Sequence, residues 1–121
     1  MIGVIFEVWP RAEHKDEYLK LAAELKSTLE AISGFISVER FQSLTDNEKL
    51  LSVSFFESHE ALDEWRNVAE HRTAQNIGRS SYFADYRLRV VNVERDYGMN
   101  ERDQAPADSV KSLAGNPDVT S

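Results

Sequence analysis

The fold is decided by residues 64–98, which run EWRNVAEHRTAQNIGRSSYFADYRLRVVNVERDYG. The first part of this stretch repeats apolar residues at helical spacing, and the last part alternates polar and apolar residues as a strand does. A Gly-Arg pair at 78–79 lies between the two patterns. The stretch therefore predicts a helix followed by a long closing strand.

The composition is that of a small acidic domain, with 121 residues, a formal net charge of -7 and no cysteine. This length predicts one domain. Because an acidic chain repels phosphate backbones, we expect no nucleic-acid partner. No apolar run approaches the roughly 20 residues that cross a bilayer, and the N-terminus lacks the basic region of a signal peptide. We therefore expect a cytoplasmic protein with no membrane partner.

A strand and a helix are predicted at the start of the chain. Residues 2–9 are almost continuously apolar and rich in β-branched and aromatic side chains, which is typical of a strand. Pro10 lacks a backbone N–H and is expected to end that strand. Residues 13–32 repeat apolar side chains at helical spacing, and Gly34 fits a C-terminal stop.

The middle of the chain predicts a hairpin and then the second helix. Residues 35–44 and 49–57 both alternate in character on either side of a polar turn. Ser58 is the expected N-cap of a helix that continues to about residue 76, and the closing strand covers residues 82–96. This order of elements predicts a ferredoxin-like α+β fold, βαββαβ, with two helices on one face of an antiparallel sheet.

The second face of this sheet also needs a partner. In the first strand Val4 and Phe6 fill one face, while Ile5 and Trp9 lie on the other. A sheet face in water would be polar, so we expect a homodimer in which two sheet faces meet.

Residues 99–121 differ from the domain predicted over residues 1–98. They are polar, contain Pro106 and Pro117, and show no clear period. This composition predicts either a flexible tail or an arm that lies on a neighbouring subunit, and both alternatives stay open.

The order of elements, together with FESHEALDEW, EHRTAQNIGR and DYRLRVVNVERDYG, resembles the antibiotic biosynthesis monooxygenase domain. The resemblance covers residues 1–98. It implies a dimeric α+β barrel with a pocket between the helices and the sheet. In this family some members oxidise aromatic polyketides to quinones without metal or flavin, others bind and degrade heme, and many have no settled activity.

The heme-degrading branch uses an Asn on the first strand, a Trp on the second helix and a His about ten residues after that Trp. Trp65 matches the Trp, but the other two positions are Phe6 and Gln75. A heme iron needs a good axial donor, which Gln is not. The resemblance therefore argues against heme degradation, and we expect no cofactor.

Periodicity predicts that Phe6, Phe55 and Trp65 face the pocket, together with Val53. An apolar pocket with a few polar groups is the usual small-ligand site, and an aromatic lining suits a flat aromatic substrate. The alternative is that these side chains are ordinary core.

His71 is the candidate catalytic base, because its unperturbed pKa near 6.5 lets it accept a proton at neutral pH. The alternative is a surface histidine bonded to Glu70 or Asp85. His71 lies six residues after Trp65, or about 120° away around an ideal helix. The two residues border the same pocket only from different sides, or if the helix bends between residues 67 and 69.

Gln75 and Arg79 are candidates to orient a substrate carbonyl or to stabilise an anionic substrate. Helix capping and ion pairing are the alternatives. No pair of histidines has the spacing of a metal site, so we expect no metal.

These observations predict a cofactor-independent monooxygenase that acts on a small aromatic or quinol-type molecule. The first alternative is a non-catalytic small-molecule-binding or structural dimer. The second alternative is a heme-binding or heme-degrading protein.

Overall fold

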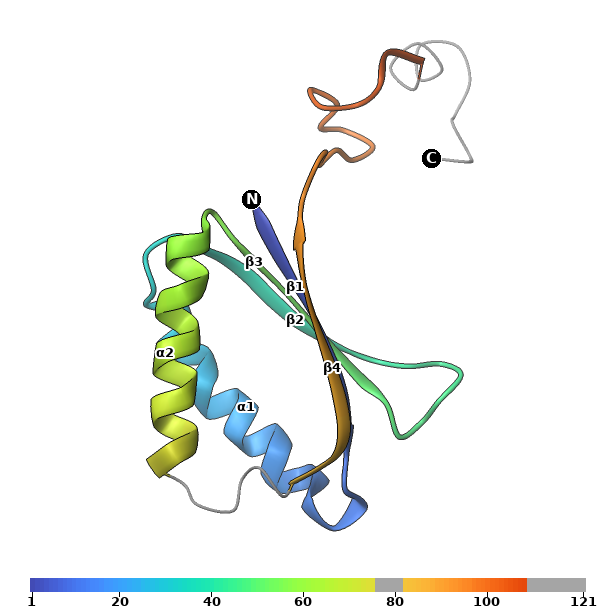
Figure 1. Cartoon of the computed structure of the whole chain (residues 1–121). Helices are drawn as coiled ribbons and strands as arrows, with labels where there is room; N and C mark the ends of the chain where they lie inside the picture. The colour runs from blue at the N-terminus through green and yellow to red at the C-terminus, as the bar shows by residue number, and fades with distance from the viewer. Residues whose placement is uncertain (76–81, 109–121) are drawn as a thin grey trace.

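The computed structural model describes residues 1–75 and 82–108, and for residues 70–75 it describes the backbone alone. Within these ranges the chain forms strands and α-helices in the predicted order (Figure 1): β1 (Ile2–Pro10), α1 (Lys15–Glu30), β2 (Phe35–Gln42), β3 (Leu50–Phe56), α2 (His59–Gln75) and β4 (Phe83–Asn92). A short 3₁₀ turn (Ala12–His14) precedes α1.

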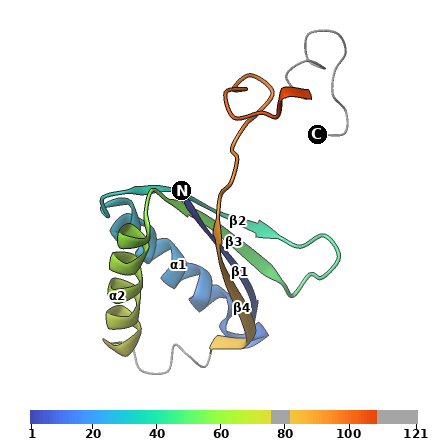
Figure 2. The same ribbon diagram turned by 45° about the horizontal axis from the view of Figure 1, so that its top comes forward.

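The four strands form one sheet in the order β2-β3-β1-β4, and each neighbouring pair is antiparallel. Both helices lie on the same side of this sheet (Figures 1 and 2). The predicted ferredoxin-like α+β fold is therefore confirmed. We call the side that carries the helices the inner face, and the opposite side the outer face.

The hairpin strands are shorter than predicted by one or two residues at their ends, and the ends of β1 and β4 also differ from the prediction. β1 continues through Pro10, which pairs with Phe83 of β4 across a register shift at Trp9 and Pro10. A bulge at this point accommodates a residue that has no N–H to give to the ladder. β4 ends at Asn92, and residues 93–108 extend away from the sheet (Figure 2). No helix in the described ranges is long and apolar enough to cross a membrane.

The core lies between the helices and the inner face and consists of two clusters of buried side chains. The larger cluster surrounds Phe56, which is completely buried, and includes Val4 and Leu29. The smaller cluster surrounds Val8 and includes Tyr18 and Leu50. The two clusters therefore meet different parts of β1, separated by the position of Phe6.

Local signals explain where α2 begins. Ser58 is its N-cap, as predicted, because the Ser58 hydroxyl accepts a hydrogen bond from the Ala61 N–H at 3.2 Å. Glu60 lies in the first turn, where its charge complements the helix dipole.

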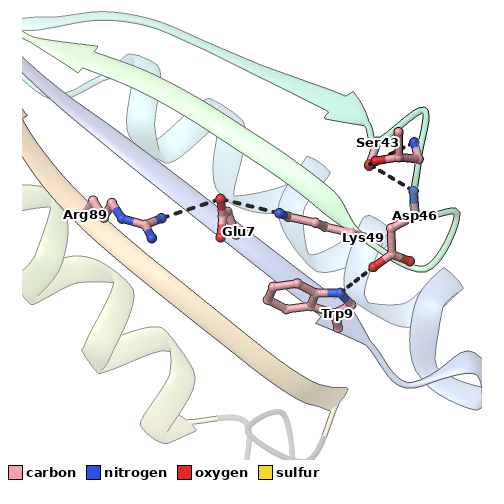
Figure 3. Close-up of polar contacts among 7 residues, drawn as sticks. Glu7, Trp9, Ser43, Asp46, Lys49 and Arg89 are labelled. Carbon is pink, nitrogen blue, oxygen red and sulfur yellow. Dashed lines mark hydrogen bonds and ion pairs between the residues drawn. The ribbon is translucent and has the colours of Figure 1, made fainter.

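Polar contacts hold one end of the outer face (Figure 3). The Glu7 carboxylate lies 3.4 Å from both Lys49 Nζ and the Arg89 guanidinium, and Trp9 Nε1 donates a hydrogen bond of 2.9 Å to Asp46. Partial burial raises the pKa of Glu7, but the two cations outweigh it, so the pKa lies below its usual value. Glu7 is therefore charged at neutral pH and links β1 to strands on both of its sides.

Gly34 lies in the turn between α1 and β2 and has a φ of 88°, a backbone conformation that favours glycine. A Cβ at Gly34 would lie 2.9 Å from the Ala61 Cβ on α2. We therefore expect Gly34→Ala to lower the free energy of unfolding by about 2 kcal/mol or more, through backbone strain and overpacking.

Chemical denaturation of the two purified proteins measures this difference. Gly98→Ala is the matched control, because a Cβ at Gly98 meets no atom within 4 Å. Equal stability of the two variants would show that the turn tolerates a side chain and that α2 can move away from it.

Candidate functional site

A cavity of about 260 Å³ lies between α1, α2 and the inner face of the sheet. Its walls include Val4 and Leu29 of the larger core cluster and Tyr18 of the smaller one, so it occupies the space between the two clusters. This volume is slightly below the roughly 300–1,000 Å³ of pockets for drug-sized ligands. The cavity is therefore suited to a small molecule.

The cavity exists because β3 presents short side chains at its centre. Ser52 and Ser54 line the cavity, while Leu50 and Phe56, at the two ends of the same strand face, are buried in the core clusters. Larger apolar side chains at the two serines would fill this space. The pattern of β3 therefore produces a hollow between two packed regions.

Phe55 does not line this cavity, contrary to the expectation from periodicity. It pairs with Gly3 on the outer face, and a Cβ built on Gly3 would lie 3.2 Å from the Phe55 ring. Val53 pairs with Ile5 and lies on the same outer face. The expectation placed Val53 and Phe55 on the side of the helices, but the pairing register with β1 places Ser52 and Ser54 there.

Phe6 and Trp65 do line the cavity. The Phe6 ring lies 6.0 Å from the Phe83 ring and 5.7 Å from the Tyr86 ring, so an aromatic group covers this wall. Trp65 is only partly buried, although its place on the apolar stripe predicted a largely buried side chain. Its remaining exposure is consistent with a position beside a cavity.

The other predicted site residues fall where the structure gives no side chain. His71 and Gln75 belong to α2, but their side chains lie outside the described residues, and Arg79 lies outside them altogether. Ala69, two residues before His71, lines the cavity. The catalytic role of His71 and the binding roles of Gln75 and Arg79 stay predictions.

Two polar residues of the cavity were missed as candidates. Arg40 of β2 lines the cavity, and its Nε is buried without a hydrogen-bond partner in the described part of the chain. Tyr18 of α1 also lines it and is buried. Burial raises the pKa of Tyr18, and the charge of the neighbouring Arg40 lowers it by less. Arg40 could have been identified from its position in the sequence, because it lies two residues after Val38, which faces the core, and residues two apart on a strand share a face.

The cavity opens towards β4. Leu88 lines it and is 51% exposed, and its neighbour Tyr86 on the same strand face is 58% exposed. β4 is an edge strand of the sheet, next to β1, and α2 lies towards the opposite edge (Figure 1). Exposed side chains therefore continue from the cavity lining along the inner face of β4.

A metal ion or a heme iron needs side chains that can donate a ligand atom. In residues 1–69 and 82–108, whose side chains are described, no group of three or more His, Asp or Glu residues is arranged to hold a metal ion. The described side chains that line the cavity include no histidine, and Phe6 offers no donor. Tyr18 is the one side chain of this described lining that belongs to a residue type known to ligate heme iron, and no histidine stands beside it.

A four-stranded antiparallel sheet, two helices on one face and a cavity between the two layers define a ferredoxin-like α+β domain with an internal cavity. Residues 1–77 match the family model of the antibiotic biosynthesis monooxygenases. The chain belongs to this family.

The chain is similar in sequence to a protein that is named as a monooxygenase. A protein named jasmonate monooxygenase from Pyricularia oryzae is 40% identical over 101 residues, which are 84% of this chain and 47% of the relative. The chain therefore spans about half the length of that protein.

Solved structures match the fold. A Mycobacterium tuberculosis protein has a TM-score of 0.69 and 18% identity, covering 80% of this chain and 98% of its own. A variant of MhuD, with two manganese protoporphyrin IX molecules bound per active site, has a TM-score of 0.62 and 22% identity, covering 81% and 99%. At these identities the two structures show a common fold alone.

Replacing Phe56 or Trp65 with alanine should lower the free energy of unfolding by different amounts. Phe56 is completely buried, so Phe56→Ala should lower the free energy of unfolding by about 3–5 kcal/mol. Trp65 already borders a cavity, so Trp65→Ala should cost less, about 1–3 kcal/mol, because fewer packing contacts are lost.

Urea denaturation of both variants checks the order of the two values. A Trp65→Ala variant as unstable as Phe56→Ala would mean that Trp65 is a core residue and that the cavity closes in solution.

Proposed function

We propose that this protein is a monooxygenase that binds a small aromatic or quinol-type molecule in the cavity and acts without metal or flavin. The observation that carries the proposal is the cavity itself, which has an aromatic wall and few polar groups. Phe6, Phe83 and Trp65 supply flat apolar surface, and Arg40 and Tyr18 supply polar atoms. A filled space at this point would have favoured a purely structural domain.

Family membership and the relative named as a monooxygenase support oxygen chemistry. The substrate itself supplies the electrons. An activated CH₂ group between aromatic rings loses a proton to a base, and the resulting carbanion reacts with dioxygen. Loss of the second C–H proton, with cleavage of the O–O bond, then gives C=O and one water. The reaction therefore consumes one dioxygen per substrate and needs no external reductant.

We assign the base to His71, whose neutral imidazole accepts a proton near neutral pH. His71 lies about 200° around an ideal helix from the cavity-lining Ala69, so this assignment requires α2 to turn between the two residues. A bound substrate lies in a space from which packed side chains exclude most water, which favours reaction of the anion with dioxygen over its reprotonation.

Oxygen consumption tests the function. We expect the purified protein to consume dioxygen with anthrone-type phenols and to incorporate heavy-isotope oxygen into the product. His71→Ala should abolish turnover while changing stability by less than about 1 kcal/mol.

His59→Ala is the matched control, because His59 is exposed at the start of the same helix. Full turnover by His71→Ala would remove the proposed base. Binding of these molecules without oxygen consumption would instead favour the non-catalytic small-molecule-binding dimer.

We also propose that the protein is a homodimer in which two outer faces meet. Ile5, Val53 and Phe55 give this face an apolar centre, and Phe41 and Val91 remain 44% and 37% exposed. Apolar surface of this kind is normally covered by a partner. A stable interface of this type buries about 2,000 Å² or more in total.

Sedimentation of the wild type at micromolar concentration should therefore show a dimer. Val53→Glu should give monomers, because it places a charge at the centre of the apolar face. Leu44→Glu is the control, since Leu44 is fully exposed in the loop after β2. A dimeric Val53→Glu variant, or a monomeric wild type, would contradict an interface through this face.

A further inference from the structure

The inner face carries a row of paired residues that changes from polar to apolar across the sheet. Arg40 of β2 pairs with Ser52 of β3, Ser52 pairs with Phe6 of β1, and Phe6 pairs with Leu88 of β4. All four residues line the cavity. Neighbouring strands lie about 4.8 Å apart, so the row is about 14 Å long, with its cation at one end.

Arg40 has no carboxylate to pair with among the described residues. Two other arginines do: Arg66 lies 3.7 Å from Asp63, and Arg89 lies 3.4 Å from Glu7. Arg40 is partly buried, and its Nε is fully shielded and lacks a hydrogen-bond partner in the described ranges. Shielding a guanidinium from water without a neighbouring anion costs free energy. The position of Arg40 therefore favours a ligand that carries a negative charge.

Tyr18 completes the polar end of the row. It extends from α1 and lines the cavity together with Arg40, whose charge is near enough to lower the pKa of the Tyr18 hydroxyl. Arg40 has only donors, so the Tyr18 hydroxyl beside it keeps its O–H to donate to a ligand. The guanidinium, the Tyr18 hydroxyl and the Ser52 hydroxyl are three donors on one side of the same cavity.

We propose that Arg40 and Tyr18 bind the carboxylate of the substrate, so that the substrate is a small apolar monocarboxylic acid. The carboxylate lies at the β2 end of the row, and the apolar body extends over Phe6 towards Leu88. A carboxylate matches the fork of one guanidinium, and its single charge balances Arg40, because Lys26, the other cation of the lining, lies 4.0 Å from the Glu30 carboxylate. This inference rests on the cavity of the proposed function and adds the chemical class of its substrate.

Binding of a matched pair of probes tests the inference independently of turnover. Naphthylacetate and naphthylacetamide have the same shape, but only the first carries a charge. Calorimetry should show that the wild type binds the carboxylate at least about tenfold more tightly than the amide, as expected for charge-assisted hydrogen bonds. Arg40→Gln should remove this preference by weakening the binding of naphthylacetate while leaving the binding of naphthylacetamide unchanged.

Tyr18→Phe is a second variant that keeps the ring in the core, and it should reduce the preference by severalfold. Arg66→Gln is the control, because Arg66 is an exposed arginine on α2 whose partner is Asp63. Circular dichroism establishes that each variant is folded before binding is compared.

Three outcomes would overturn the carboxylate site: equal binding of the two probes, a preference that survives in folded Arg40→Gln, or no binding of either probe at millimolar concentration. Failure of the monooxygenase function is a different result, because oxygen consumption can be absent while the preference for the carboxylate remains. If Arg40 served the reacting oxygen instead, Arg40→Gln would lower kcat and leave the two probe affinities unchanged.

Discussion

The pairing register between β1 and β3 is the constraint on which the rest of the structure depends. It places Phe6 beside Ser52 and Val4 beside Ser54, so a large side chain on one strand meets a small one on the next. A shift of one residue would exchange the two faces of β3 and fill the cavity with Val53 and Phe55. The two core clusters would then merge, and the domain would have no internal site.

Much of the fold was predictable because each element carries a local pattern. Helical spacing, the Ser58 cap and the alternation on either side of the hairpin are local, and they gave the correct order of elements. The end of β1 was misplaced at Pro10, because a bulge that accommodates proline depends on β4, which is distant in sequence. Alternation within a strand separates two sets of residues, but it does not say which set the helices cover.

The same limit explains which residues of the cavity were predictable and which were not. Phe6 and Trp65 line the cavity as expected, since large apolar residues on an amphipathic element face the core. Phe55 was misassigned because β3 has large apolar residues in both sets. Arg40 was overlooked because an arginine on a strand is usually a surface residue, and its burial follows from α1 and Tyr18 above it.

The exposed position of β4 at the edge of the sheet affects how readily separate chains aggregate. This strand is ten residues long and lies at the edge of the sheet, with Leu88, Val90 and Val91 exposed. An open apolar edge is a template on which further chains can add strands and aggregate. Arg87 and Arg89 interrupt this segment with like charges, which repel a second copy in register. Besides pairing with Glu7, Arg89 thus places on the edge strand a charge of the kind that opposes the addition of further strands.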